Sequence, residues 1–84
     1  MQICEVWSIS AERIRDYLLS QSDVLQKEND RFSCGLCELS LTALPLRKTG
    51  RFRFPQTKVE FSGPEDETLE IHRRFVIQFI SAGG

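Results

Sequence analysis

The segment that decides the expected fold is Thr68 to Ile80, with the sequence TLEIHRRFVIQFI. From Leu69 onward every second residue is apolar except Arg73, and this period places side chains on one face of a β-strand. Val76 and Ile80 add apolar side chains to the other face, and a strand that is apolar on both faces is usually covered on both. The sequence therefore predicts a central β-strand from Leu69 to Ile80.

Two elements are expected near the N-terminus. Residues Gln2 to Trp7 alternate loosely between polar and apolar and predict a short strand. Ser10 suits a helix N-cap, and apolar residues then recur every three or four positions, which predicts an amphipathic helix from about Ala11 to Lys27. The run from Ser20 to Asp23 weakens this helix, because Ser and Asp side chains compete for backbone hydrogen bonds. A break into two short helices is the alternative.

A second region of period-two alternation begins at Phe32 and continues to Ala43. Its phase changes once, and a β-bulge near Gly35 would reconcile the two halves. Pro45 is expected to end this strand, since proline cannot donate to a sheet ladder.

The polar residues 47–51 predict a turn into the next strand, which begins at Phe52 and extends to Phe61. Pro55 interrupts this strand and favours an edge or bulged position for it. The short turn at residues 62–66 would then make the segment Leu69 to Ile80 an antiparallel neighbour.

The expected fold class is therefore α+β. A short N-terminal strand and one amphipathic helix precede a three-stranded antiparallel meander (β-α-β-β-β), and the helix packs on one face of the sheet in a two-layer sandwich. With 84 residues, the chain is expected to form one small domain spanning residues 1–84.

The composition is that of a soluble globular protein, with 40% hydrophobic and 27% charged residues. No apolar run approaches the roughly 20 residues that a membrane-spanning helix needs, and the N-terminus lacks the basic and apolar regions of a signal peptide. We therefore expect a cytoplasmic protein without membrane association. The net charge of −1 selects no class of partner.

Three cysteines are an odd number in a chain without an export signal, so reduced thiols are expected. The CxxC sequence formed by Cys34 and Cys37 could place two thiolates on one metal ion, with Cys4 and His72 completing a Cys3His zinc site. The preferred interpretation is that these cysteines are small buried apolar residues, because the CxxC lies within a strand pattern. We expect no metal and no cofactor.

A basic segment with interleaved aromatic residues lies between Glu38 and Glu60, with no acidic residue inside it. Its five basic residues are Arg47, Lys48, Arg51, Arg53 and Lys58. Basic side chains beside Phe52 and Phe54 would suit a phosphate backbone with stacked bases. The competing interpretation is a solvated hairpin with two faces, in which the arginines point outward while Phe52 and Phe54 pack inward. The acidic residues after Gly63 would help to neutralise its charge.

The C-terminal sequence Phe79 to Gly84, FISAGG, resembles the tails of the ubiquitin-like sulfur carriers of thiamine and molybdopterin biosynthesis. In those proteins a final hydrophobic strand runs into a flexible Gly-Gly. The resemblance implies that Gly83 and Gly84 form a carrier tail, whose terminal carboxylate is adenylated and then converted to a thiocarboxylate. The resemblance covers about the last ten residues, which makes it a short motif.

No residue combination reaches the specificity of a catalytic site, because the one histidine has no partner in its motif. The expected function is therefore a non-enzymatic binding or adaptor domain that contacts another protein. A nucleic-acid binder through residues 47–58 and a sulfur carrier through Gly83 and Gly84 are the alternatives. Formation of a homo-oligomer through an exposed strand edge is also compatible with the pattern.

Overall fold

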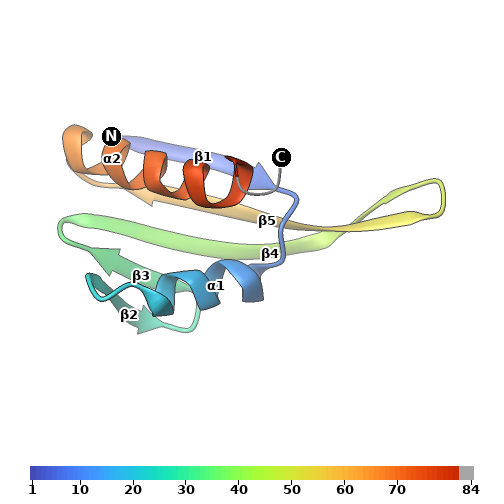
Figure 1. Ribbon diagram of the computed structural model, residues 1–84, viewed down its shortest axis with the longest axis horizontal. Helices are drawn as coiled ribbons and strands as arrows, with labels where there is room; N and C mark the ends of the chain where they lie inside the picture. The colour runs from blue at the N-terminus through green and yellow to red at the C-terminus, as the bar shows by residue number, and fades with distance from the viewer. Residues whose placement is uncertain (82–84) are drawn as a thin grey trace.

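The computed structural model describes residues 1–81 of the chain, and the fold is given for these residues (Figure 1). They form five strands, two α-helices and a short π-helix. In chain order these are β1 (Gln2–Trp7), α1 (Ala11–Ser20), β2 (Val24–Glu28), β3 (Arg31–Cys34), β4 (Cys37–Thr49), β5 (Phe52–Ser62), α2 (Glu65–Val76) and η1 (Ile77–Ser81). The strands form one antiparallel sheet in the order β1-β5-β4-β3-β2.

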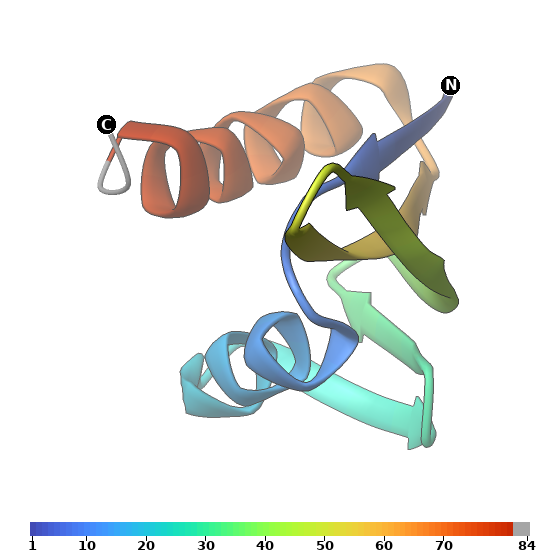
Figure 2. The same cartoon turned by 90° about the vertical axis from the view of Figure 1, so that its right-hand side faces the viewer.

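Both α-helices lie on the same face of this sheet, as Figure 2 shows. Tyr17 of α1 meets Phe75 of α2 edge to face, with ring centroids 5.3 Å apart. The fold is therefore α+β with two layers, as the sequence predicted, and β1 lies where the N-terminal strand was expected. Within residues 1–81, no helix has the length and apolar character needed to cross a membrane.

The prediction of a central strand from Leu69 to Ile80 is wrong, because this segment is helical in α2 and η1. The buried side chains of α2 are Thr68, Ile71 and Phe75. They recur at intervals of three and four, the period of one helix face. Leu69 and Ile77, which belong to the period-two series, are 43% and 57% exposed.

The ends of α2 carry the signals of a helix. Pro64 stands at its N-cap, three acidic residues occupy its first turn, and Arg73 and Arg74 lie in its last turn. This charge order complements the helix dipole, which is positive at the N-terminus and negative at the C-terminus. Gly63 is required before the helix, since a Cβ there would lie 2.8 Å from the carbonyl oxygen of Leu36.

The expected helix from Ala11 to Lys27 is also corrected, because α1 ends at Ser20 and β2 begins at Val24. Its start is confirmed: the hydroxyl of Ser10 accepts a hydrogen bond from the backbone N–H of Arg13 at 3.2 Å. At the other end the Ser20 hydroxyl donates to the Tyr17 carbonyl oxygen at 2.6 Å, and residue 21 is extended. The polar run stops the helix and does not divide it in two.

The expected bulge near Gly35 is instead a tight turn between β3 and β4. Cys34 pairs directly with Cys37, and Gly35 has a positive φ of 60°. Glycine adopts this backbone conformation without the Cβ penalty that other residues incur. The phase change in the sequence therefore marks a change of strand, and the predicted meander of three strands becomes a run of four, β2 to β5.

Pro45 does not end β4, which continues to Thr49 and turns at Gly50. The ladder between β4 and β5 is irregular between Leu44 and Arg47, where β4 carries an extra residue opposite Pro55. Proline lacks the N–H that a ladder requires, so the bulge lies where both strands lose a donor. An edge or a bulged position was expected for β5. The edge position is wrong, because β5 lies between β1 and β4, whereas the irregular ladder opposite Pro55 agrees with the bulged alternative.

The helix register gives a direct test of the two-layer packing. Leu18 is fully buried, whereas its neighbour Leu19 is 52% exposed. The substitution Leu18→Asp places a charge in the core and should lower the free energy of unfolding by more than about 3 kcal/mol. Leu19→Asp, the matched control, should change it by less than about 0.5 kcal/mol. Urea denaturation of both variants measures the difference, and equal effects would contradict the observed register.

Candidate functional site

The most distinctive surface of the molecule is the far end of the β4–β5 hairpin. Residues 45–54, called the arm below, are all exposed. Figure 1 shows the arm extending beyond the sheet and helices, which gives the molecule its longest dimension of 41 Å. The arm is the outer part of the long strands β4 and β5 and begins at the bulge at the two prolines.

The arm exposes three large apolar side chains, those of Leu46, Phe52 and Phe54. Phe52 is 68% exposed, and its ring stacks on that of Phe54 with centroids 6.2 Å apart and ring planes inclined by 25°. Apolar residues exposed together on a soluble domain are typical of a binding surface, because burying each one in a partner is favourable by about 1.5–3 kcal/mol. The prediction that the two phenylalanines pack inward is therefore wrong.

The arm is also strongly basic. Its charged residues are Arg47, Lys48, Arg51 and Arg53. Lys48 stands directly opposite Arg53 in the ladder, an arrangement of like charges that destabilises a hairpin. No carboxylate among residues 1–81 lies within 4.0 Å of these four side chains. Removing their four charges from the 11 basic and 12 acidic residues of the chain leaves a body with a net charge of −5.

Lys58, the fifth basic residue of the predicted site, does not belong to the arm. It lies on the sheet between Val6 and Thr42, and its ammonium group is 3.7 Å from the carboxylate of Glu60. The acidic residues expected to neutralise the basic segment lie on α2, three of them in its first turn, which begins near the opposite end of β5 (Figure 1). The arm therefore keeps its positive charge.

The structure does not assemble the alternative zinc site. Cys4 is exposed, on the face of the sheet that α1 and α2 leave open, whereas Cys34 and Cys37 are buried. His72 lies on α2 and contacts Glu5, with its Nε2 atom 2.6 Å from the carboxylate. Within the part of the chain that the structure describes, no three His, Cys, Asp or Glu side chains form a metal-ligand group.

Burial decides the chemistry of the two paired thiols. It raises the pKa of Cys37, and burial together with the Asp23 carboxylate raises the pKa of Cys34. Both shifts disfavour the thiolate, which is the nucleophilic form of cysteine. The prediction that these cysteines serve as small buried apolar residues is thus consistent with their surroundings.

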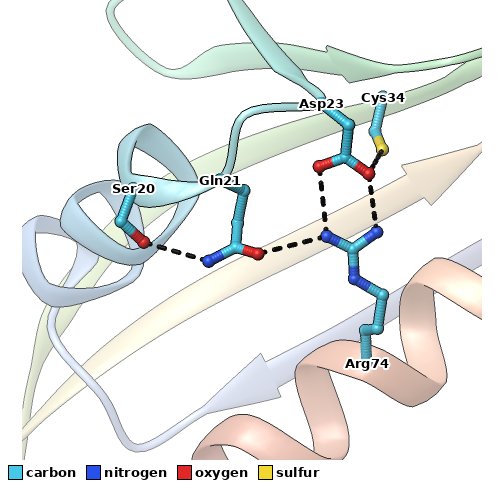
Figure 3. Close-up of polar contacts among 5 residues, drawn as sticks. All are labelled: Ser20, Gln21, Asp23, Cys34 and Arg74. Carbon is cyan, nitrogen blue, oxygen red and sulfur yellow. Dashed lines mark hydrogen bonds and ion pairs between the residues drawn. The ribbon is translucent and has the colours of Figure 1, made fainter.

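Figure 3 shows a polar cluster that connects α2 to the start of β2. The guanidinium of Arg74 donates to both carboxylate oxygens of Asp23, at 2.9 and 3.2 Å, and to the side-chain oxygen of Gln21 at 3.3 Å. The Cys34 thiol donates to the same carboxylate at 3.5 Å. The hydrogen bond from Arg74 lowers the pKa of Asp23, which keeps this carboxylate charged.

This cluster was not predicted from the sequence, because Asp23 and Arg74 are 51 positions apart. The one available signal was the pair of arginines at the end of an acidic-to-basic segment, which indicates a helix. The predicted tail residues Gly83 and Gly84 lie outside the described residues.

The Arg74–Asp23 pair should have a pH-dependent effect on stability. Because the pKa of Asp23 is lowered in the folded protein, its contribution is present above the unfolded pKa of about 3.9 and is lost as the pH falls through the folded pKa. Arg74→Gln should therefore lower the free energy of unfolding by about 0.5–1 kcal/mol at pH 7, since the pair is partly exposed, and by less below about pH 3. The exposed Arg13→Gln serves as the control. An unchanged difference between pH 7 and pH 3 would contradict this role.

The comparisons with known proteins concern the whole chain. A search of curated proteins gives no match. Residues 2–84 match the family described as archaeal MoaD-like protein, which covers all but the first residue. The chain therefore belongs to the family of archaeal MoaD-like proteins.

Proposed function

We propose that this MoaD-like chain is a non-enzymatic binding domain that docks on another protein through the arm. The observation that carries the proposal is the exposure of Phe52 and Phe54, stacked on each other at the end of a projecting hairpin. Aromatic and arginine side chains dominate the binding energy of protein interfaces, and the arm presents both types together.

The charge distribution supports a protein partner over a nucleic acid. The arm carries four positive charges, but the rest of the chain has a net charge of −5. A polyanion that extended from the arm toward the sheet would meet this negative body, and its affinity depends on many phosphate contacts. A protein whose surface has an apolar recess with an acidic rim would complement the arm without contacting the rest of the chain. The basic residues would then mainly accelerate encounter, and the phenylalanines would hold the complex together.

The arm hypothesis makes a prediction about contacts in the cell. A photo-crosslinking amino acid at position 52 should capture a defined protein from the source cell, whereas the same group at position 25 should not. Leu25 is a suitable control because it is as exposed as Phe52 but lies on β2, away from the arm. With the captured protein purified, Phe52→Ser should weaken binding by at least about 2 kcal/mol without altering the melting temperature.

Two outcomes would contradict the proposal. Crosslinking from position 25 alone would place the contact elsewhere on the surface. The second outcome is tight binding of the arm to single-stranded RNA or DNA. If this binding weakened steeply between about 50 and 200 mM salt and was lost when the arm's four basic residues became glutamine, it would favour the nucleic-acid alternative, because phosphate contacts depend strongly on salt.

A sulfur carrier is the second candidate, and membership of the MoaD-like family favours it. In the carriers that the tail resembles, a hydrophobic strand precedes Gly-Gly, whereas here α2 and η1 precede it. Phe79 is buried in the core and η1 extends to Ser81, so three residues follow the last residue of η1 in this sequence.

Mass spectrometry separates the carrier from the binding domain. The chain would be incubated with ATP, a sulfur donor and extract of the source cell. Conversion of the carboxylate to a thiocarboxylate replaces one oxygen with one sulfur and adds about 16 daltons, at a terminus that gains a nucleophilic sulfur. We expect no such species. Its appearance, and its loss when Gly83 and Gly84 are deleted, would reverse the order of the two candidates.

A further inference from the structure

The outer edge of β1 is unpaired among residues 1–81, because β1 is the last strand of the sheet. Met1 and Gly63 exchange two backbone hydrogen bonds, at 2.8 and 3.1 Å. Residues of an antiparallel strand alternate between bonding to the neighbour and facing away from it. Counting from Met1, the backbone N–H and C=O groups that point away from β5 are those of Gln2, Cys4 and Val6.

This edge lacks the features that usually prevent pairing between molecules. β1 contains no proline, no lysine and no bulge. Its one charged residue, Glu5, is held on the helix side of the sheet, where it accepts a hydrogen bond from the indole N–H of Trp7 at 3.3 Å and contacts His72 at 2.6 Å. The edge therefore presents neutral side chains and three residues with unpaired backbone groups.

We propose that β1 pairs with β1 of a second copy of this chain, antiparallel and about a two-fold axis at Cys4. In this register Gln2 of each copy lies opposite Val6 of the other, so the outward backbone groups of both strands are paired. The two sheets join into one continuous sheet. Self-pairing of this kind gives an isologous interface, the commonest arrangement in soluble dimers.

Helix α2 supplies the charge complementarity for this arrangement. It runs in the same direction as β1 (Figure 1) and is held beside it by the contact between His72 and Glu5. A strand rises about 3.3 Å per residue and a helix about 1.5 Å, so the level of Cys4 on β1 corresponds to about Glu70 on α2. A two-fold axis at that level places Asp66 of one copy across from Arg73 of the other, and the reverse.

The exposed side of α2 indicates that the occupant of this surface is a second copy of the same helix. A shallow hollow on α2 is lined by Asp66, Leu69, Glu70, His72 and Arg73, with Leu69 exposed in it. Of these residues, His72 contacts Glu5 of β1. The acidic first turn and basic last turn of α2 complement a second α2 only when that helix is reversed, as the two-fold axis requires. The two Glu70 carboxylates then lie nearest the axis, and their repulsion keeps the dimer weak.

This dimer leaves the arm free, so the inference goes beyond the proposed function and does not rest on it. The arm extends from the end of the sheet and β1 forms its side (Figure 1). In an antiparallel dimer the two arms therefore point in opposite directions. Such a dimer would present two binding elements to its partners, which raises avidity where both can engage.

Analytical ultracentrifugation of the full chain over a concentration series, with a short bismaleimide crosslinker as a second probe, tests the proposal. We expect a dimer that is crosslinked through Cys4, because Cys34 and Cys37 are buried. Cys4→Ser should retain the dimer and lose the crosslink. Cys4→Pro should lose the dimer at an unchanged melting temperature, since it removes an outward N–H that does not bond to β5.

Charge reversal provides a second test, which does not depend on whether the Cys4→Pro variant folds. Asp66→Arg and Arg73→Asp should each weaken the dimer about fivefold, and the double variant should restore it to within about twofold, as expected for an exposed ion pair. If the chain stays monomeric up to about 0.5 mM, the proposal is overturned, because the affinity of one copy for another would then be too low for a dimer to form. A dimer that persists in a folded Cys4→Pro variant, or one that the double variant does not restore, would overturn it as well.

Discussion

The fold depends on one aromatic cluster at the junction of its two layers. Trp7, at the end of β1, lies within 6.2 Å of the rings of Phe61, Phe75 and Phe79. Tyr17 brings α1 into the same cluster through edge-to-face contacts with Phe75 and Phe79. Each such aromatic pair contributes about 0.5–1.5 kcal/mol beyond the burial of its surface. Because the cluster joins the sheet to both helices, it fixes which face of the sheet is covered.

The cluster also determines where the C-terminal segment can go. Burial of Phe79 holds η1 against Trp7 and Tyr17, so the helical path continues to Ser81. A strand over the same residues could not place both Phe75 and Phe79 beside Tyr17 while leaving Ile77 exposed. The chain thus belongs to the family of archaeal MoaD-like proteins, and its described C-terminal segment is helical up to Ser81. This helical path is the reason that we propose a binding role ahead of a carrier role.

The arm shows how a stable body can support an unfavourable surface. Stacked exposed phenylalanines and the opposed pair Lys48 and Arg53 both cost stability. The inner parts of β4 and β5 offset this cost, because their buried residues Leu39, Leu41, Val59 and Phe61 lie in the core. A hairpin anchored at its base in this way can carry a surface that would not fold in isolation.

Local sequence signals determined much of this protein. They were sufficient for the α+β class, for β1, for the N-cap at Ser10, and for the basic and aromatic character of residues 47–54, because each depends on neighbours within a few positions. The secondary structure of Thr68 to Ile80 was not determined in this way, because its apolar residues fit both a period of two and a period of three to four.

The charge order at the ends of α2 favours a helix locally, but only tertiary packing decided which side chains are buried: Ile71, Phe75 and Phe79 lie in the core, whereas Leu69 and Ile77 are exposed. The same limit applied to the pairing of Asp23 with Arg74 and to the exposure of Phe52 and Phe54. Whether a side chain is buried depends on surfaces that distant segments supply, and a local pattern contains no information about those segments.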